Sequence, residues 1–280
     1  LFCFILIVSV LSSAPAYANY NAVYEKSLTD SGDNPIYAGI YLMINLDNDT
    51  VIFEKDADKQ TAPASLTKIM TATVVLENCK DLDEEVEADY STIHLLDGTG
   101  SSMVGLEPGE KMSVKNLLYC MLVRSGNDAA NVLAMHIGGS MEGFVKMMND
   151  KAAALGCKNT HYDNPHGLDS DTHYSTAEDI AIIAKAALKY DEFKTIVSTA
   201  RYTLPATNQN KEPEEMIGLK KNKRGDMVLT IDSYVDIDSI PDIQSDYFDC
   251  IYINTTSERA FHAILFGASP ILSYKCSYKP

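Results

Sequence analysis

The chain has 280 residues, of which 46% are apolar and 22% are charged. A chain of this length and composition can bury the core of one large domain or two small ones, which excludes wholesale disorder. Its formal net charge is −16, the sign that a phosphate backbone repels, so we expect no nucleic-acid partner.

The N-terminus carries the pattern of an export signal. Residues 1–11 are almost wholly apolar, and small residues follow them up to the A-x-A pattern at residues 16–18. Such a run is typical of a secretory signal peptide and is too short for a membrane span. We therefore predict a signal peptide over residues 1–18, incomplete at its N-terminus, and an exposed polar leader over residues 19–35. The tail from Ala268 to Pro280 has no amphipathic pattern, so the sequence shows no membrane anchor.

Five of the six cysteines lie beyond the signal, at irregular spacings and without a C-x-x-C pair. An odd number at such spacings predicts neither a disulfide framework nor a zinc site of the C-x-x-C type. Cys79 and Cys120 lie within helix-like apolar patterns, so we expect both in the core.

Beyond the leader, the patterns change from strand-like to helical and back. Residues 36–45 and 51–55 are rich in aromatic and β-branched residues, which predicts an opening β-hairpin. Helices are predicted over 65–77, 114–123 and 128–137, in a segment that stops at Gly156, and from a capping box at Ser175 and Glu178. Residues 81–89 are expected to be a solvated acidic surface, 98–109 a loop, and 228–235, 250–254 and 261–266 strands. This order predicts an α+β fold with a largely antiparallel sheet.

The first chemical signal is a serine three residues before a lysine, Ser65 and Lys68. Residues three apart on a helix are neighbours, so the two side chains can meet. A serine hydroxyl needs a nearby base to become a nucleophile, and a lysine can be that base when burial or positive charge destabilises its ammonium. The spacing alone is weak evidence, because it is common on helix surfaces.

The second signal is Ser125-Gly126-Asn127, which lies between two predicted helices. A turn at such a junction can direct the Ser125 hydroxyl and the Asn127 amide into a cleft. Ser, Gly and Asn also favour helix caps and turns, so taken alone the segment is better explained as an N-cap and turn.

Together the two signals resemble the penicillin-binding and serine β-lactamase superfamily, whose motifs include S-x-x-K and S-D-N. More narrowly, the chain resembles the low-molecular-mass serine D-alanyl-D-alanine carboxypeptidases, in which the second motif is Ser-Gly-Asn. The resemblance covers roughly residues 36–208. The matching segments are residues 64–72 (ASLTKIMTA), 125–131 (SGNDAAN), 164–168 (NPHGL) and 173–177 (HYSTA).

The resemblance implies a β-lactamase/transpeptidase-like α+β fold, with a catalytic portion over residues 36–210 and a divergent continuation over 211–280. It implies that Ser65 forms the acyl-enzyme, that Lys68 is the general base, and that Ser125 relays a proton. Asn127 would then hold the lysine and the substrate, and backbone N–H groups, one of them from Ser65, would form an oxyanion hole.

The implied activity is removal of the terminal D-alanine from peptidoglycan stem peptides during cell wall biogenesis. β-Lactam antibiotics would be covalent inhibitors, no cofactor or metal would be needed, and the chain would act outside the cytoplasm.

The third motif of the family, Lys-Thr-Gly, is absent from the chain. Lys223-Arg224-Gly225 lies near the expected separation and precedes a strand-like run, which makes Lys223 the candidate for binding the substrate carboxylate. A solvated basic turn is the alternative interpretation. The departure keeps open a second hypothesis, a catalytically impaired relative that binds peptidoglycan or penicillin.

Two further hypotheses receive less support from the sequence. A β-lactamase would need an efficient deacylating base, and the sequence offers no match for one. A metal site could be drawn from a set of imidazoles and carboxylates in one segment, although that segment matches a structural loop of the carboxypeptidases: His161, Asp163, His166, Asp169, Asp171 and His173.

Overall fold

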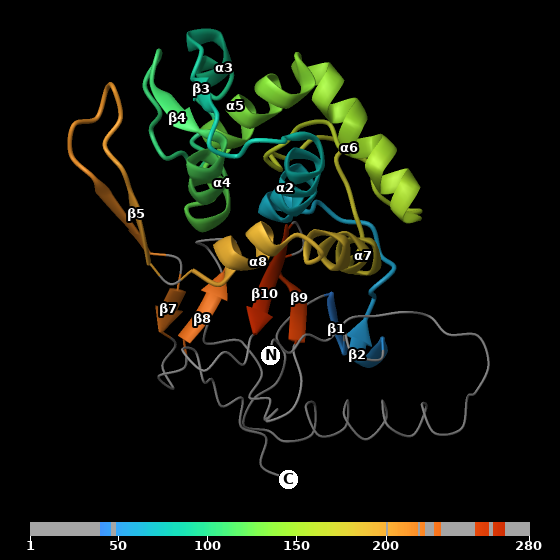
Figure 1. Cartoon of the computed structure of the whole chain (residues 1–280). Coiled ribbons are helices and arrows are strands. Elements are labelled where there is room, and N and C mark those ends of the chain that lie inside the picture. Colours follow the sequence, from blue (N-terminus) through green and yellow to red (C-terminus); the bar gives the residue numbers. More distant parts are fainter. Residues whose placement is uncertain are drawn as a thin grey trace, which may run out of the picture.

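The computed structural model describes residues 40–45, 49–199, 201–217, 219–221, 227–230, 250–257 and 260–266. The predicted signal peptide at 1–18 and leader at 19–35 lie outside these residues. Figure 1 shows a sheet on one side of the molecule and a block of helices on the other.

The sheet is antiparallel and has the strand order β2-β1-β9-β10-β8-β7. Its strands are β1 (Tyr41–Asn45), β2 (Thr50–Lys55), β7 (Leu219–Lys221), β8 (Met227–Thr230), β9 (Cys250–Ser257) and β10 (Ala260–Phe266). β1 pairs with β2 on one side, which confirms the opening hairpin, and with β9 on the other. The beginning and the end of the described chain therefore meet in one sheet.

The helices form the second part of the fold (Figure 1). They are the 3-10 turn η1 (Ala64–Leu66), α2 (Thr67–Asn78), α3 (Tyr90–His94), α4 (Val114–Val123), α5 (Asn127–Gly138), α6 (Met141–Leu155), α7 (Ala177–Ala187) and α8 (Asp191–Val197). α7 contacts β1 and β9 and also packs against α2, so it joins the sheet to the helical block. η1 contacts β10, which places Ser65 next to the sheet.

α2 is the central helix, with every residue from Thr67 to Val75 buried. A helix surrounded by protein does not need one polar face, provided that its polar side chains find partners. Thr73, for example, donates a hydrogen bond of 2.7 Å to the Ile69 carbonyl one turn earlier. Lys68 is buried on this same helix and must be held by its surroundings.

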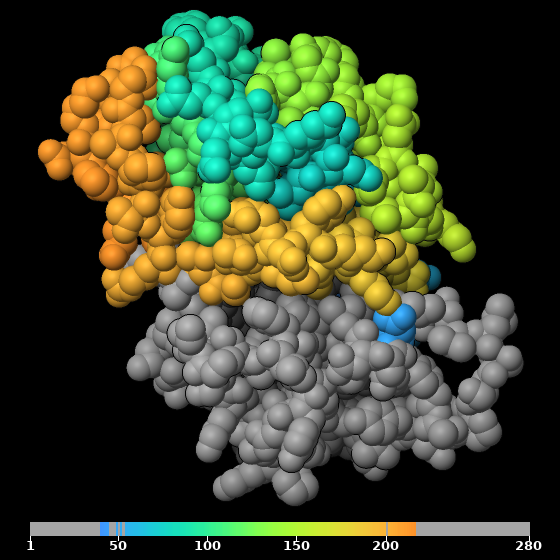
Figure 2. Space-filling view, viewed as in Figure 1, coloured from blue at the N-terminus to red at the C-terminus, as the bar shows by residue number. Residues whose placement is uncertain are grey.

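Two short strand pairs flank the helices: β3 (Glu85–Glu87) with β4 (Lys111–Ser113), and β5 (Arg201–Leu204) with β6 (Glu214–Ile217). The β5–β6 hairpin lies at one edge of the molecule, orange in Figure 2. The Tyr202 ring stacks on Tyr119 of α4 with 3.6 Å between the ring centroids. The Asn208 side chain accepts a hydrogen bond from the Lys111 backbone N–H and donates one to the Gly109 carbonyl.

The predicted α+β class and the long helices are confirmed, while the short elements α3, α8, β3, β4, β5, β6 and β7 were not predicted. β3 corrects the expectation of a wholly solvated acidic surface at 81–89, because Val86 is buried between exposed Glu85 and Glu87. Three to seven residues carry too little periodicity to be recognised without their packing partners.

The predicted capping box at Ser175 and Glu178 is displaced by one residue. Thr176 is the N-cap of α7, and its hydroxyl accepts a hydrogen bond of 3.1 Å from the Asp179 amide. Ser175 exchanges two backbone hydrogen bonds with Thr61 instead, a long-range pairing that the local sequence does not reveal.

Cys120 is fully buried as expected, whereas Cys79 at the end of α2 is only partly buried. No helix within the described ranges has the length and apolar character needed to cross a bilayer.

Candidate active site

Ser65 lies in the turn that leads into α2. Pro63 precedes this turn, and Ala64 adopts a left-handed backbone conformation with φ of +46°. Such a conformation is costly for a residue with a side chain and is typical of strained functional sites. Ser65 is only partly buried, whereas the next turn of the chain is buried.

Lys68 lies one turn further on and is fully buried. Its Nζ donates hydrogen bonds of 3.1 Å to Ser65 Oγ and 2.8 Å to the carbonyl oxygen of His166. A neutral amine has two N–H groups and one lone pair, so it could keep the bond to His166 and accept the Ser65 proton. The geometry therefore suits a base that activates the serine.

Ser125 completes a cluster of three side chains. Its Oγ lies 2.7 Å from Ser65 Oγ, although 60 residues separate the two serines in the chain. The break between α4 and α5 places it there, since Ser125 adopts a φ of +56° and is 3% exposed. The structure thus brings Ser65, Lys68 and Ser125 together as the sequence predicted.

Asn127 begins α5 and is buried, and its backbone N–H donates a hydrogen bond of 2.9 Å to the Ser102 carbonyl. Its place two residues after Ser125 agrees with the predicted motif, and its role toward Lys68 and substrate remains a prediction. Lys223, the candidate for the substrate carboxylate, lies outside the described residues.

Asp128 anchors the segment over residues 104–106, a contact that the sequence did not predict. Its fully buried carboxylate accepts hydrogen bonds of 2.8–3.0 Å from the backbone N–H groups of Val104, Gly105, Leu106 and Ala129. Gly126 next to it allows close packing, because a Cβ there would lie 2.9 Å from Val104 Cγ1. The turn that holds Ser125 is therefore fixed from two sides.

The loop over residues 163–173 also belongs to the site. It supplies the His166 carbonyl to Lys68 and the Pro165 carbonyl to Thr71, the latter at 2.6 Å. The sequence identifies this segment by its resemblance to the carboxypeptidases and predicts a structural loop. Its contact with Lys68 spans 98 residues, and only the family resemblance could have signalled it.

Two histidines of this loop are neutral at physiological pH. Burial, together with the nearby positive charge of Lys68, lowers the pKa of His166 to about 3. Burial also lowers the pKa of His173 to about 4, against the opposing effect of Asp163 and Asp169. Neutral imidazoles add no positive charge beside Lys68 at neutral pH.

The metal hypothesis received little support from the sequence. In the described part of the chain, no three His, Cys, Asp or Glu side chains lie in an arrangement that could bind a metal ion. The side chains are used within the loop instead. Asp163 accepts hydrogen bonds from Ser170 and Thr172, and His173 contacts Thr67 of α2.

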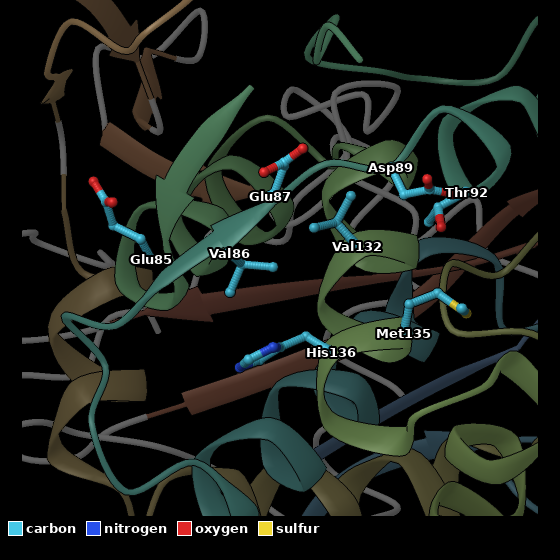
Figure 3. A pocket seen from close by; sticks show the side chains of 8 residues that line it. All are labelled: Glu85, Val86, Glu87, Asp89, Thr92, Val132, Met135 and His136. Carbon is cyan, nitrogen blue, oxygen red and sulfur yellow. The ribbon is translucent and has the colours of Figure 1, made fainter. Parts of the chain in front are cut away.

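A separate cavity of about 310 Å³ lies between β3, α3 and α5 (Figure 3). Its lining combines apolar side chains with carboxylates, a hydroxyl and an imidazole: Glu85, Val86, Glu87, Asp89, Thr92, Val132, Met135 and His136. None of the four described candidate residues contributes to it, so it is distinct from the Ser65 cluster.

A helical block on an antiparallel sheet, with a serine–lysine–serine cluster at the start of a buried helix, defines the class of penicillin-binding serine enzymes. The family model of peptidase S11, D-alanyl-D-alanine carboxypeptidase, matches residues 27–231. The chain therefore belongs to the D-alanyl-D-alanine carboxypeptidase family.

Individual relatives agree with this assignment. The chain is 41% identical over 158 residues to D-alanyl-D-alanine carboxypeptidase DacF of Bacillus subtilis, an alignment that covers 56% of this chain and 41% of DacF. It is 38% identical over 161 residues to DacA of Escherichia coli K12, with 55% and 40% covered. The chain thus spans less than half the length of these relatives.

The crystal structure of the Streptomyces K15 DD-transpeptidase is similar to the structure described above, with a TM-score of 0.63 and 28% sequence identity. The match covers 83% of this chain and 88% of the Streptomyces protein. The predicted transpeptidase-like fold is confirmed by this similarity.

Proposed function

We propose that this protein is a serine D-alanyl-D-alanine carboxypeptidase, which removes the terminal D-alanine from peptidoglycan stem peptides during cell wall biogenesis. The observation that carries the proposal is the hydrogen-bonded cluster of Lys68, Ser65 and Ser125, in which Ser65 is only partly buried. Family membership supports the same chemistry.

In the first half-reaction, Lys68 accepts the hydroxyl proton while Ser65 Oγ attacks the carbonyl carbon of the penultimate D-alanine. The carbonyl oxygen becomes an oxyanion, which backbone N–H groups of an oxyanion hole stabilise. The C–N bond then breaks, and the proton that Lys68 took passes through the Ser125 hydroxyl to the departing amine of the terminal D-alanine, which leaves Lys68 neutral again. The products of this step are free D-alanine and an ester on Ser65.

In the second half-reaction, water attacks the ester carbonyl and gives up a proton to the same base. Ser65 leaves with a proton and the shortened stem peptide is released. The Lys68–Ser65 contact serves both directions, because the group that removes a proton in acylation returns it in deacylation. β-Lactam antibiotics acylate Ser65 in the same way and act as covalent inhibitors.

The substrate lies in the cell wall, so the chain acts outside the cytoplasm, as the signal-like residues 1–18 indicate. The catalytically impaired relative remains the second candidate because the sequence lacks Lys-Thr-Gly. Such a protein would keep the fold and the family resemblance but would not complete acylation.

The test is intact-protein mass spectrometry after incubation with a labelled penicillin, followed by peptide mapping. We expect one adduct, on Ser65, and none in the Ser65→Ala variant. A matched Ser91→Ala variant, which removes an exposed hydroxyl on α3, should be labelled like the wild type. A folded wild type without an adduct would support the impaired relative and would contradict the proposed activity.

A further inference from the structure

We propose that Gly167 and His173 are positioning residues for acylation, which hold the 163–173 loop against the start of α2 and thereby fix Lys68 beside Ser65. This proposal rests on the proposed function, because it concerns the base of that reaction. Neither residue needs to touch the reacting atoms. Both act through the carbonyl of His166, which accepts the hydrogen bond from Lys68.

Gly167 brings the loop into direct backbone contact with the turn that carries Ser65. It has a φ of +93°, and a Cβ at this position would lie 1.8 Å from the Ala64 carbonyl oxygen and 3.0 Å from Thr67 Oγ1. An atom cannot approach a backbone oxygen that closely, so any side chain forces the loop and the turn apart. Because His166 directly precedes Gly167, such a shift moves the carbonyl that holds Lys68.

His173 fastens the other end of the loop to the same helix. Its Nδ1 accepts a hydrogen bond of 3.0 Å from the Asp163 backbone N–H, so in the neutral ring the proton is on Nε2. That Nε2 lies 2.8 Å from Thr67 Oγ1 and therefore donates to it. One imidazole thus bridges the start of the loop, its end and the first residue of α2.

These contacts meet α2 next to Lys68. Thr67 and Thr71 share one face of the helix, and their hydroxyls bind His173 and the Pro165 carbonyl. The loop therefore covers the first turn of α2 on the side where Lys68 is held by His166. A displacement of about 1 Å in a catalytic group can cost on the order of 10²-fold in rate, which makes such support kinetically visible.

The first experiment compares Gly167→Ala with Gly156→Ala. Gly156 at the end of α6 has a similar φ of +88°, but an added Cβ there meets nothing within 4 Å. Both variants place a side chain at a similar left-handed φ, and only Gly167→Ala collides with Ala64. We measure the rate constant for acylation by a fluorescent penicillin, the dissociation constant of the preceding non-covalent complex, and thermal unfolding.

We expect Gly167→Ala to acylate about 10²-fold more slowly with a dissociation constant within twofold of wild type. Gly156→Ala should acylate at the wild-type rate. A wild type without an adduct would refute the proposed function and the positioning role with it. A reactive wild type and an equally fast, folded Gly167→Ala variant would refute the positioning role alone.

A second comparison covers the case in which Gly167→Ala does not fold. His173→Leu removes both hydrogen bonds, whereas His173→Gln keeps an N–H that can reach Thr67. We expect the leucine variant to lose at least about tenfold in acylation rate and the glutamine variant to recover most of that loss. Equal rates for the two folded variants, or wild-type rates in both, would overturn the role of His173.

Discussion

Ser125 combines a strained backbone with a hydroxyl that the proposed chemistry needs. Its φ of +56° is a conformation that costs a residue with a Cβ roughly 1–2 kcal/mol and that glycine adopts freely. The side chain returns part of that cost through the hydrogen bond of 2.7 Å to Ser65. We therefore expect a substitution of Ser125 to change activity much more than stability.

Substitution of Ser125 by glycine tests this expectation. Relief of backbone strain offsets the lost hydrogen bond, so we expect Ser125→Gly to unfold within about 1 kcal/mol of wild type. Without the proton relay, release of D-alanine from a stem-peptide analogue should fall by roughly 10² or more. Urea unfolding and a D-alanine release assay measure the two effects.

The control is Asp56→Gly, which removes a side chain at a similar φ of +49° on the exposed turn after β2. It should leave D-alanine release unchanged. If Ser125→Gly retains wild-type turnover, Ser125 is not the relay.

At the scale of elements, the break between α4 and α5 is fixed in position by hydrogen bonds to the loop that precedes α4. Four backbone N–H groups converge on the Asp128 carboxylate, which is fully buried. Hydrogen bonds to a charged acceptor are stronger than neutral ones, and their loss leaves buried donors without partners. The position of Ser125 thus depends on a carboxylate three residues further along the chain.

Asp128→Ala should lower the free energy of unfolding by about 3 kcal/mol or more, because the variant leaves several buried amides unpaired. The control Asp150→Ala removes the exposed partner of Lys146 on α6 and should cost less than about 0.5 kcal/mol. Urea unfolding at pH 7 compares the three proteins. Equal stability of the two variants would show that the carboxylate does not anchor the loop.

At the scale of the whole molecule, one buried helix, α2, connects the nucleophile to the sheet, the other helices and the 163–173 loop. β1 pairs with β9, α7 packs on both the sheet and α2, and the turn before α2 contacts β10. Two neutral histidines, His166 and His173, lie in the loop that seals this helix. We therefore expect acid to lower the free energy of unfolding of the whole molecule, because it protonates the histidines in this loop.

The sign of this effect follows from the pKa values. Burial lowers the pKa of His173 from 6.5 to about 4, so between these values the unfolded chain binds more protons than the folded one. The contribution of His173 is complete above pH 6.5 and is lost as the pH falls toward 4, at most on the order of 3 kcal/mol. His166 extends the loss toward pH 3.

Urea unfolding at pH 7 and pH 4.5 measures this loss. His173→Gln should lose less stability between the two pH values than wild type, because its share of the proton uptake is gone. His94→Gln, which changes a histidine at the surface end of α3, should follow the wild type. If His173→Gln loses as much stability between pH 7 and pH 4.5 as the wild type does, His173 does not cause the effect.

Prediction from sequence was most accurate where a periodic apolar pattern extended over many residues or where several motif residues lay close together. The helix over 114–123 is confirmed at both ends, because its apolar spacing and its flanks agree. The strands β5 and β6 escaped prediction since they are four residues each and are stabilised by contacts such as the Tyr202–Tyr119 stack. Lys223 remains a prediction outside the described residues.

Sequence alone determined the α+β class, the family, and three residues that meet in the site, because helical spacing fixes Ser65 against Lys68 and the motif text identifies Ser125. Only the tertiary structure decided how the site is held. Lys68 binds a carbonyl 98 residues away, and Gly167 packs its backbone against Ala64. The reason is physical: local spacing governs neighbours on one helix, whereas contacts between distant segments exist only after the chain has packed.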